Sequence, residues 1–156
     1  MKKIILFIIV SIILCSCKSN DLHTTNYFSS VTIDTLLQDK ISIRALLIDK
    51  EKIWYAADQS RFGCIDLKSN QKKEIQIPAD KNREYRSIAQ TKEHIFILSV
   101  ANPALLYRIS KKDLSYELVY QETHEKVFYD SMQFWNDMEG IAIGDPIEGV
   151  FSLLKT

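Results

Sequence analysis

Short apolar runs separated by turn residues recur three times along this chain. Ser42, Ser87 and Ser131 begin equivalent runs and lie 45 and 44 residues apart. A second set of equivalent positions, 42 and 46 residues apart, is Ile53, Ile95 and Ile141. Four short strands in a period of about 40–50 residues are typical of a β-propeller blade. We therefore predict an all-β fold, a partial β-propeller, with a β-sandwich or a clam of stacked meanders as the alternative.

The repeat predicts two four-stranded blades and three strands of a third. They occupy about residues 41–79, 85–122 and 128–156 of an incomplete propeller domain, 31–156. The expected strands are 42–46, 53–56, 64–67, 74–77, 86–89, 95–98, 106–109, 116–119, 130–134, 141–144 and 150–153. The second strand of each unit is apolar nearly throughout, which predicts cover on both faces by neighbouring blades. No stretch has a sustained 3.6-residue apolar period, so little helix is expected beyond the N-terminal signal.

The N-terminus has the pattern of a secretory signal. A basic start precedes the apolar run Ile4–Leu14, which is shorter than the roughly 20 residues of a bilayer span. The small residues before Cys17 resemble a bacterial lipobox, which implies that residues 1–17 form a lipoprotein signal peptide and that Cys17 carries the lipid. An uncleaved anchor helix is the alternative. Residues 18–30 are polar and read as a flexible tether.

This reading predicts a protein of the cell envelope that contacts the membrane through lipidated Cys17. The whole chain has 20 basic and 20 acidic residues, and loss of the two signal lysines leaves a net charge of −2. Such a balance gives no electrostatic reason to expect nucleic-acid binding.

Two stretches of the third unit, Phe128–Trp135 and Gly140–Pro146, resemble bacterial secreted propeller proteins. These proteins are related to BNR-repeat (Asp-box) proteins and to photosystem II stability/assembly factors. Ser42–Leu46 and Asn102–Tyr107 are similar to the same group. The repeat scaffold itself favours a propeller that binds a protein or glycan ligand. The relation to Asp-box propellers implies the alternative, a BNR-type glycosidase-like hydrolase.

The chain departs from this group in two respects. The hairpins Asp66–Gln71 and Ser110–Ser115 lack the Asp-box pattern. A closed propeller also needs at least about four blades, so we expect a fragment of a longer protein or a truncated, non-functional product. A binding or assembly module is favoured over an enzyme, because no catalytic constellation stands out in the sequence.

Three charged residues on the predicted innermost strands are the candidate channel or ligand site: Arg44, Arg86 and Asp130. Two arginines can hold a carboxylate or phosphate through paired hydrogen bonds. The alternative is an ion pair between blades, for example Arg86 with Asp130. No motif predicts a cofactor or a metal site, since His23, His94 and His124 lack metal-ligand spacing.

The remaining reactive or aromatic residues have simpler interpretations. Cys64, in an apolar stretch, is expected to be a small core residue. Trp54 and Trp135 are expected to pack within or between blades.

Two pairs of acidic residues, Asp137 with Glu139 and Glu122 with Glu125, could serve glycoside hydrolysis. Their spacing is the only support for that role, so we interpret them as exposed charges in turns. Among the histidines, His124 beside Glu122 is the strongest of the weak candidates for a functional site. Gly144-Asp145-Pro146 is expected to form a tight turn, with Asp145 bonded to nearby backbone N–H groups.

Residues Val31–Leu37 stand outside the repeats. Their β-branched residues favour a strand, and their position suits the outermost strand of a blade that this chain does not encode. In this chain we therefore expect the segment to be weakly ordered or exposed along an edge of the first blade.

Overall fold

The computed structural model describes residues 30–77 and 82–156. The chain divides into two units, Met1–Asp34 and Thr35–Thr156, and the strands of the described residues lie in the second. The predicted signal peptide lies outside the described residues, as does all of the predicted tether except Ser30. No helix in the described part of the chain is long and apolar enough to cross a membrane.

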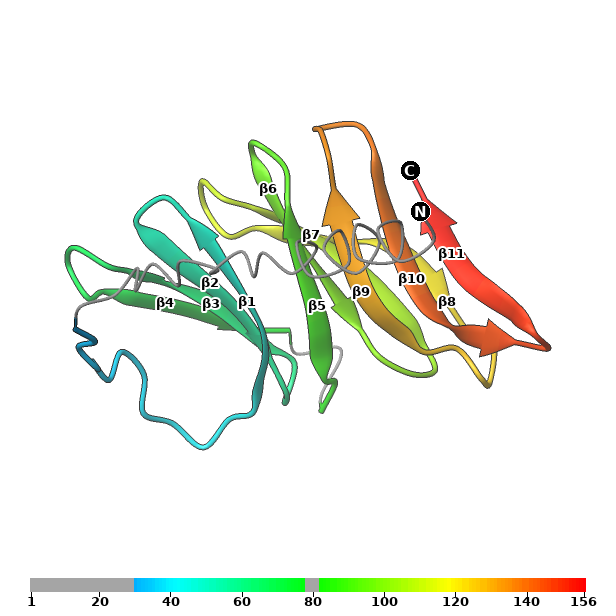
Figure 1. Ribbon diagram of the computed structural model, residues 1–156, viewed down its shortest axis with the longest axis horizontal. Coiled ribbons are helices and arrows are strands. Elements are labelled where there is room, and N and C mark those ends of the chain that lie inside the picture. Colours follow the sequence, from blue (N-terminus) through cyan, green and yellow to red (C-terminus); the bar gives the residue numbers. More distant parts are fainter. Residues whose placement is uncertain (1–29, 78–81) are drawn as a thin grey trace, which may run out of the picture. The chain divides into compact units, whose positions relative to one another are not determined.

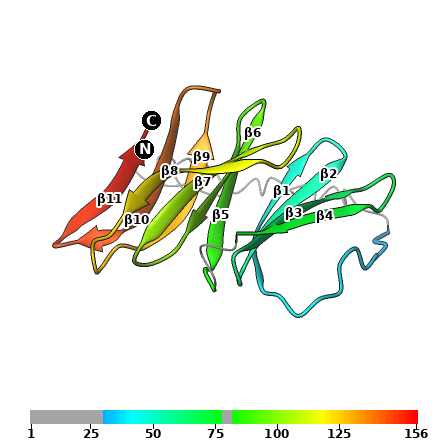
Figure 2. The same cartoon turned by 180° about the vertical axis from the view of Figure 1, so that it is seen from behind.

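Three antiparallel sheets make up the second unit (Figure 1; the reverse view is Figure 2). The first is β1 (Ile43–Asp49), β2 (Lys52–Ala57), β3 (Arg61–Asp66) and β4 (Lys72–Gln76). The second is β5 (Tyr85–Gln90), β6 (His94–Ser99), β7 (Ala104–Ser110) and β8 (Tyr116–Glu122). The third is β9 (Tyr129–Phe134), β10 (Gly140–Ile147) and β11 (Val150–Lys155). Each sheet pairs its strands in chain order, so all eleven predicted strands and their division into three meanders are confirmed.

Buried side chains join each sheet to the next. Trp54, Phe62 and Cys64 of the first sheet pack against residues of the second such as Tyr85 and Ile97. A second cluster joins the second sheet to the third, where the rings of Phe96 and Phe134 stack with centroids 4.4 Å apart. The expectation that Trp54 and Cys64 are core residues is therefore confirmed.

The first strands of the three sheets run in the same direction. Near their starts, Arg44 of β1 pairs with Glu84, and Arg86 of β5 faces Asp130 of β9. At the other ends of β1 and β5, Asp49 and Gln90 both accept a hydrogen bond from the Lys111 side chain. The starts and the ends of the first strands therefore form two separate surfaces.

The cover by neighbouring blades expected on both faces of every second strand holds for β6 but is wrong for β2 and β10. One face of β2 is covered by Leu37 and Ile41, which belong to no blade. Ala142 is buried against the second sheet, whereas Ile141 and Ile143 are exposed. Alternating side chains of a strand point to opposite faces of the sheet. Within the described residues, no further sheet packs on the face that carries Ile141 and Ile143.

Gly144-Asp145-Pro146 does not form the expected turn. The segment lies inside β10, and the register shifts between Gly144 and Pro146. The Asp145 N–H donates to the Phe128 carbonyl at 2.8 Å. A Cβ on Gly144 would lie 2.2 Å from that same carbonyl, so the close approach requires glycine here. The turn comes at Glu148 and Gly149, both with positive φ.

Residues 31–37 form no strand, and Val31 and Ile33 are exposed. The following stretch crosses the first sheet, where Leu37 and Ile41 pack against a buried cluster of Tyr55, Ala57 and Ile65. The prediction of exposure is confirmed for residues 31–36. The strand-like pattern forms no ladder because the segment has no strand partner in the described chain.

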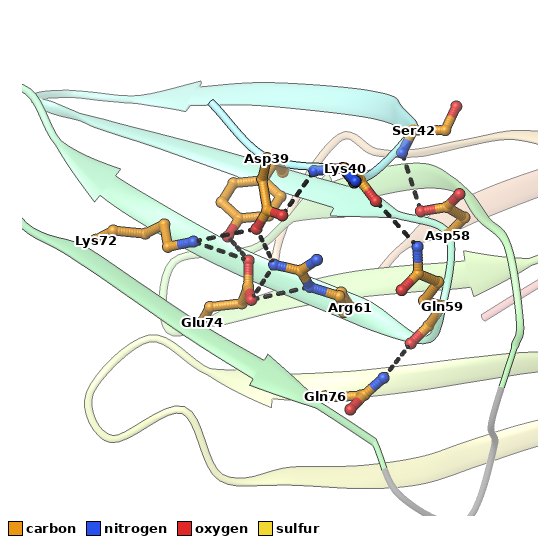
Figure 3. A network of polar contacts seen from close by, with 10 residues as sticks. Asp39, Lys40, Ser42, Asp58, Gln59, Arg61, Lys72, Glu74 and Gln76 are labelled. Atoms are coloured by element: carbon orange, nitrogen blue, oxygen red, sulfur yellow. Dashed lines mark hydrogen bonds and ion pairs between the residues drawn. The ribbon is translucent and has the colours of Figure 1, made fainter. Parts of the chain in front are cut away.

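A polar network holds this stretch in place (Figure 3). Arg61 pairs with Asp39 at 2.5 Å and with Glu74 at 2.5 Å. The Tyr55 hydroxyl donates to Glu74, and burial together with that hydrogen bond raises the tyrosine pKa. Burial alone would raise the pKa of Glu74, but hydrogen bonds from Tyr55 and Arg61 outweigh it and lower the pKa.

Candidate functional site

The predicted channel residues lie on the first strands but form two separate pairs. Arg86 Nε is 3.8 Å from Asp130 Oδ1, and its guanidinium lies 5.2 Å from the centroid of the Phe128 ring. Arg44 Nε pairs with Glu84 Oε1 at 3.1 Å. All four charged side chains are at least one third exposed. The arrangement matches the ion-pair interpretation, and each arginine has an acidic partner in the protein.

The other charged candidates have structural partners. Glu122 accepts hydrogen bonds from the N–H groups of Thr123 and His124, and these bonds lower its pKa. His124 Nδ1 accepts from the Lys126 N–H at 3.1 Å. Across residues 30–77 and 82–156, no three His, Cys, Asp or Glu side chains are grouped so that they could hold a metal ion. Burial raises the pKa of the Cys64 thiol, which makes it a poor nucleophile.

A groove that sequence reasoning missed lies at the ends of the first strands. Its volume is about 430 Å³, within the range of small-ligand sites. Its lining, which we call the loop groove, consists of Asp49, Lys50, Gln90, Thr91, Lys92, Lys111, Phe134, Trp135, Asn136 and Asp137. These residues come from all three sheets, so only the packing of the sheets brings them together.

Lys111 connects the first two sheets within the groove. From the β7–β8 turn, its Nζ donates to Asp49 Oδ2 at 2.8 Å and to Gln90 Oε1 at 2.7 Å. Its side chain is 16% exposed and that of Asp49 23%. The Lys111 N–H also bonds the Glu93 carbonyl at 3.0 Å. This wall of the groove is therefore preorganised.

The β9–β10 hairpin forms the opposite wall. Asp137 Oδ1 accepts from the Lys92 N–H at 2.6 Å, which ties this hairpin to the β5–β6 turn. Glu139 Oε2 accepts from Trp135 Nε1 at 3.2 Å and from Asn136 Nδ2 at 2.7 Å. The bond from Asn136 is the main cause of the lowered pKa of Glu139. The acidic pair Asp137 and Glu139 thus shapes the hairpin.

Trp135 is 56% exposed, so the expectation that it packs within or between blades is wrong. The preceding residue, Phe134, takes the packed position instead and stacks on Phe96. A Cβ at Gly140 would lie 2.7 Å from the Phe134 ring, so this glycine makes room for it. Trp135 follows β9 and lies in the turn, where its Nε1 bonds Glu139. The sequence feature that could have predicted this exposure is the position of Trp135 in the polar turn Trp-Asn-Asp-Met-Glu.

Comparison with solved structures identifies the fold. The structure of U3-55K matches with a TM-score of 0.54 at 14% identity, over 76% of this chain and 41% of that one. The crystal structure of RRP9 WD40 repeats matches with a TM-score of 0.55 at 13% identity, over 76% of this chain and 40% of that one. The chain is a partial β-propeller. It spans about two fifths of each of these structures.

The sequence comparisons add no closer relationship. A scan against protein-family models finds no match, and a search of curated proteins finds none. The similarity to the WD40 propellers therefore concerns the fold alone.

Proposed function

We propose that this protein is a lipid-anchored binding module of the cell envelope whose propeller blades hold a protein or glycan partner at the loop groove. The observation that carries the proposal is the groove itself. Its hydrogen-bonded walls come from three sheets, and Trp135 is exposed beside them. Exposed aromatic side chains on rigid supports are frequent binding hot spots. The propeller fold supports a scaffold role, and the resemblance of the third unit to Asp-box propellers supports a secreted one.

The binding role is tested by site-specific photo-crosslinking in cells. Met138 is exposed at the tip of the β9–β10 hairpin, and Leu118 is an exposed position on β8. A photoreactive residue at position 138 of the full chain should give a discrete adduct, and one at position 118 should not. Adducts at neither position, or equally at both, would contradict binding at the groove. Sensitivity of the adduct to protease or to periodate distinguishes a protein from a glycan partner.

The anchor is tested separately. The full chain should incorporate a palmitate analogue in bacteria, and Cys17→Ser should abolish labelling and release the protein from membranes. Equal labelling of both proteins would refute the lipobox interpretation.

A further inference from the structure

We propose that the loop groove binds a neutral sugar ring of an oligosaccharide, with Trp135 as the stacking surface. This inference rests on the proposed function and names the chemistry of the ligand. A pyranose ring has a C–H face that packs on an aromatic ring and a rim of hydroxyl groups that need donors and acceptors. The groove supplies both kinds of contact.

Trp135 is exposed, and its indole ring is restrained by a hydrogen bond. The only polar atom of the ring, Nε1, already donates to Glu139 Oε2. A restrained aromatic ring loses little side-chain entropy on binding. The largest aromatic surface in the groove is therefore suited to an apolar face of the ligand.

The unsatisfied polar atoms of the groove match hydroxyl groups. Gln90 Oε1 is occupied by Lys111, and Asp137 Oδ1 by the Lys92 N–H. Among described residues, no group bonds Gln90 Nε2, Thr91 Oγ1 or Asp137 Oδ2. These are a donor, a group that donates and accepts, and an acceptor. A hydroxyl can donate and accept, so each of these atoms has a complement on a sugar.

The charges in the groove do not favour an ionic ligand. Asp49 and Lys111 neutralise each other at 2.8 Å, and Lys92 lies 3.9 Å from Glu93. Lys50 and Asp137 are exposed at turns, where solvent and salt screen their charges. A buried, unpaired charge would be required to select an acidic or basic ligand strongly.

The backbone of the groove does not favour an extended peptide. Strand addition needs a row of free N–H and C=O groups. Here the Thr91 N–H bonds the His94 carbonyl at 2.9 Å and the Trp135 N–H bonds the Glu139 carbonyl at 3.2 Å. The N–H groups of Lys92 and Lys111 are also bonded, as described above. These bonded N–H groups leave no row for strand addition here, so we expect a ligand to bind mainly through side chains.

The test titrates the full chain in detergent with neutral oligosaccharides of glucose, galactose, mannose and N-acetylglucosamine, read by isothermal calorimetry and by tryptophan fluorescence. Trp54 is buried, so the fluorescence response to ligand and to acrylamide reports on Trp135. We expect at least one sugar to bind and to protect Trp135 from quenching. Trp135→Ala should weaken binding at least about tenfold, and Trp135→Phe should retain most of it. Phe151→Ala, at an exposed aromatic residue outside the groove, is the matched control and should bind normally.

Salt and charge variants complete the test. Affinity should stay within about twofold between low and high salt and in Lys50→Gln or Lys92→Gln. A steep fall with salt or in these variants would overturn the neutral-sugar proposal in favour of an acidic ligand. Absence of any Trp135-dependent sugar binding would also overturn it. If the crosslink at position 138 then captures a protein, the proposed function stands without the sugar; if it captures nothing, both fail.

Discussion

Lys111→Met should destabilise the protein far more than a comparable change at the surface. The substitution keeps the aliphatic stem but removes the ammonium group that joins Asp49 of the first sheet to Gln90 of the second. Asp49 then remains three-quarters buried without its partner. The loss should therefore appear in the free energy of unfolding.

The magnitude follows from burial. Exposed ion pairs contribute about 0–1 kcal/mol, whereas removing one member of a fully buried pair costs about 3–5 kcal/mol. Lys111 is 16% exposed and Asp49 is 23% exposed, so an intermediate loss of about 2 kcal/mol is expected. With a urea m-value of about 1–2 kcal/mol per M, the midpoint of unfolding should fall by about 1–2 M.

The control is Lys68→Met. Lys68 Nζ lies 2.6 Å from Glu51, closer than Lys111 lies to Asp49, but these side chains are 74% and 54% exposed. Its loss should cost less than about 0.5 kcal/mol. The test compares the urea midpoints of the two variants, with unfolding monitored by circular dichroism. Equal midpoints for the two variants would refute the argument that burial makes the Lys111 contact important.

Three further predictions concern other parts of the domain. The lowered pKa of Glu74 predicts a contribution to stability that is complete above its unfolded pKa of about 4.3 and is lost as pH falls through the folded pKa. Glu74→Gln removes one of the two carboxylates paired with Arg61, so the urea midpoint should depend less on pH across that range in this variant. Phe151 and Leu153 are exposed on the uncovered face of the third sheet, so we expect the protein to self-associate through this face. Phe151→Ser with Leu153→Ser should reduce that self-association in sedimentation velocity, and unchanged sedimentation would contradict this expectation. Amide hydrogens of Ile33–Leu37 should exchange fast, whereas slow exchange would reveal a strand partner.

The strands were predictable because their signals are local. Alternating or continuous apolar runs between turn residues predict the strands, regardless of how the sheets pack on one another. The one misread turn, at Gly144-Asp145-Pro146, fails for a tertiary reason. The Phe128 carbonyl accepts from the Asp145 N–H and holds the segment in a strand bulge. The residues near position 145 in the sequence do not indicate that Phe128 is the partner.

The loop groove was not predictable in the same way. Lys111 is 62 residues from Asp49, and Asp137 is 45 residues from Lys92. Contacts of this kind depend on how one sheet packs on the next. The spacing of Ile53, Ile95 and Ile141 illustrates the difficulty. It identifies the repeat, yet Ile95 is buried toward the first sheet while Ile141 lies on the exposed face of the third.

The two outer sheets differ in how their free faces are covered. On the first sheet, Leu37 and Ile41 occupy the apolar face, and Arg61 holds that segment through Asp39. On the third sheet, Phe151 and Leu153 are 62% and 60% exposed, and nothing in the described chain covers them. A blade that docked on the first sheet would have to displace a packed and ion-paired segment. A blade that docked on the third would bury apolar area without breaking any described contact. Further blades, from any source, should therefore add to the third sheet more readily than to the first.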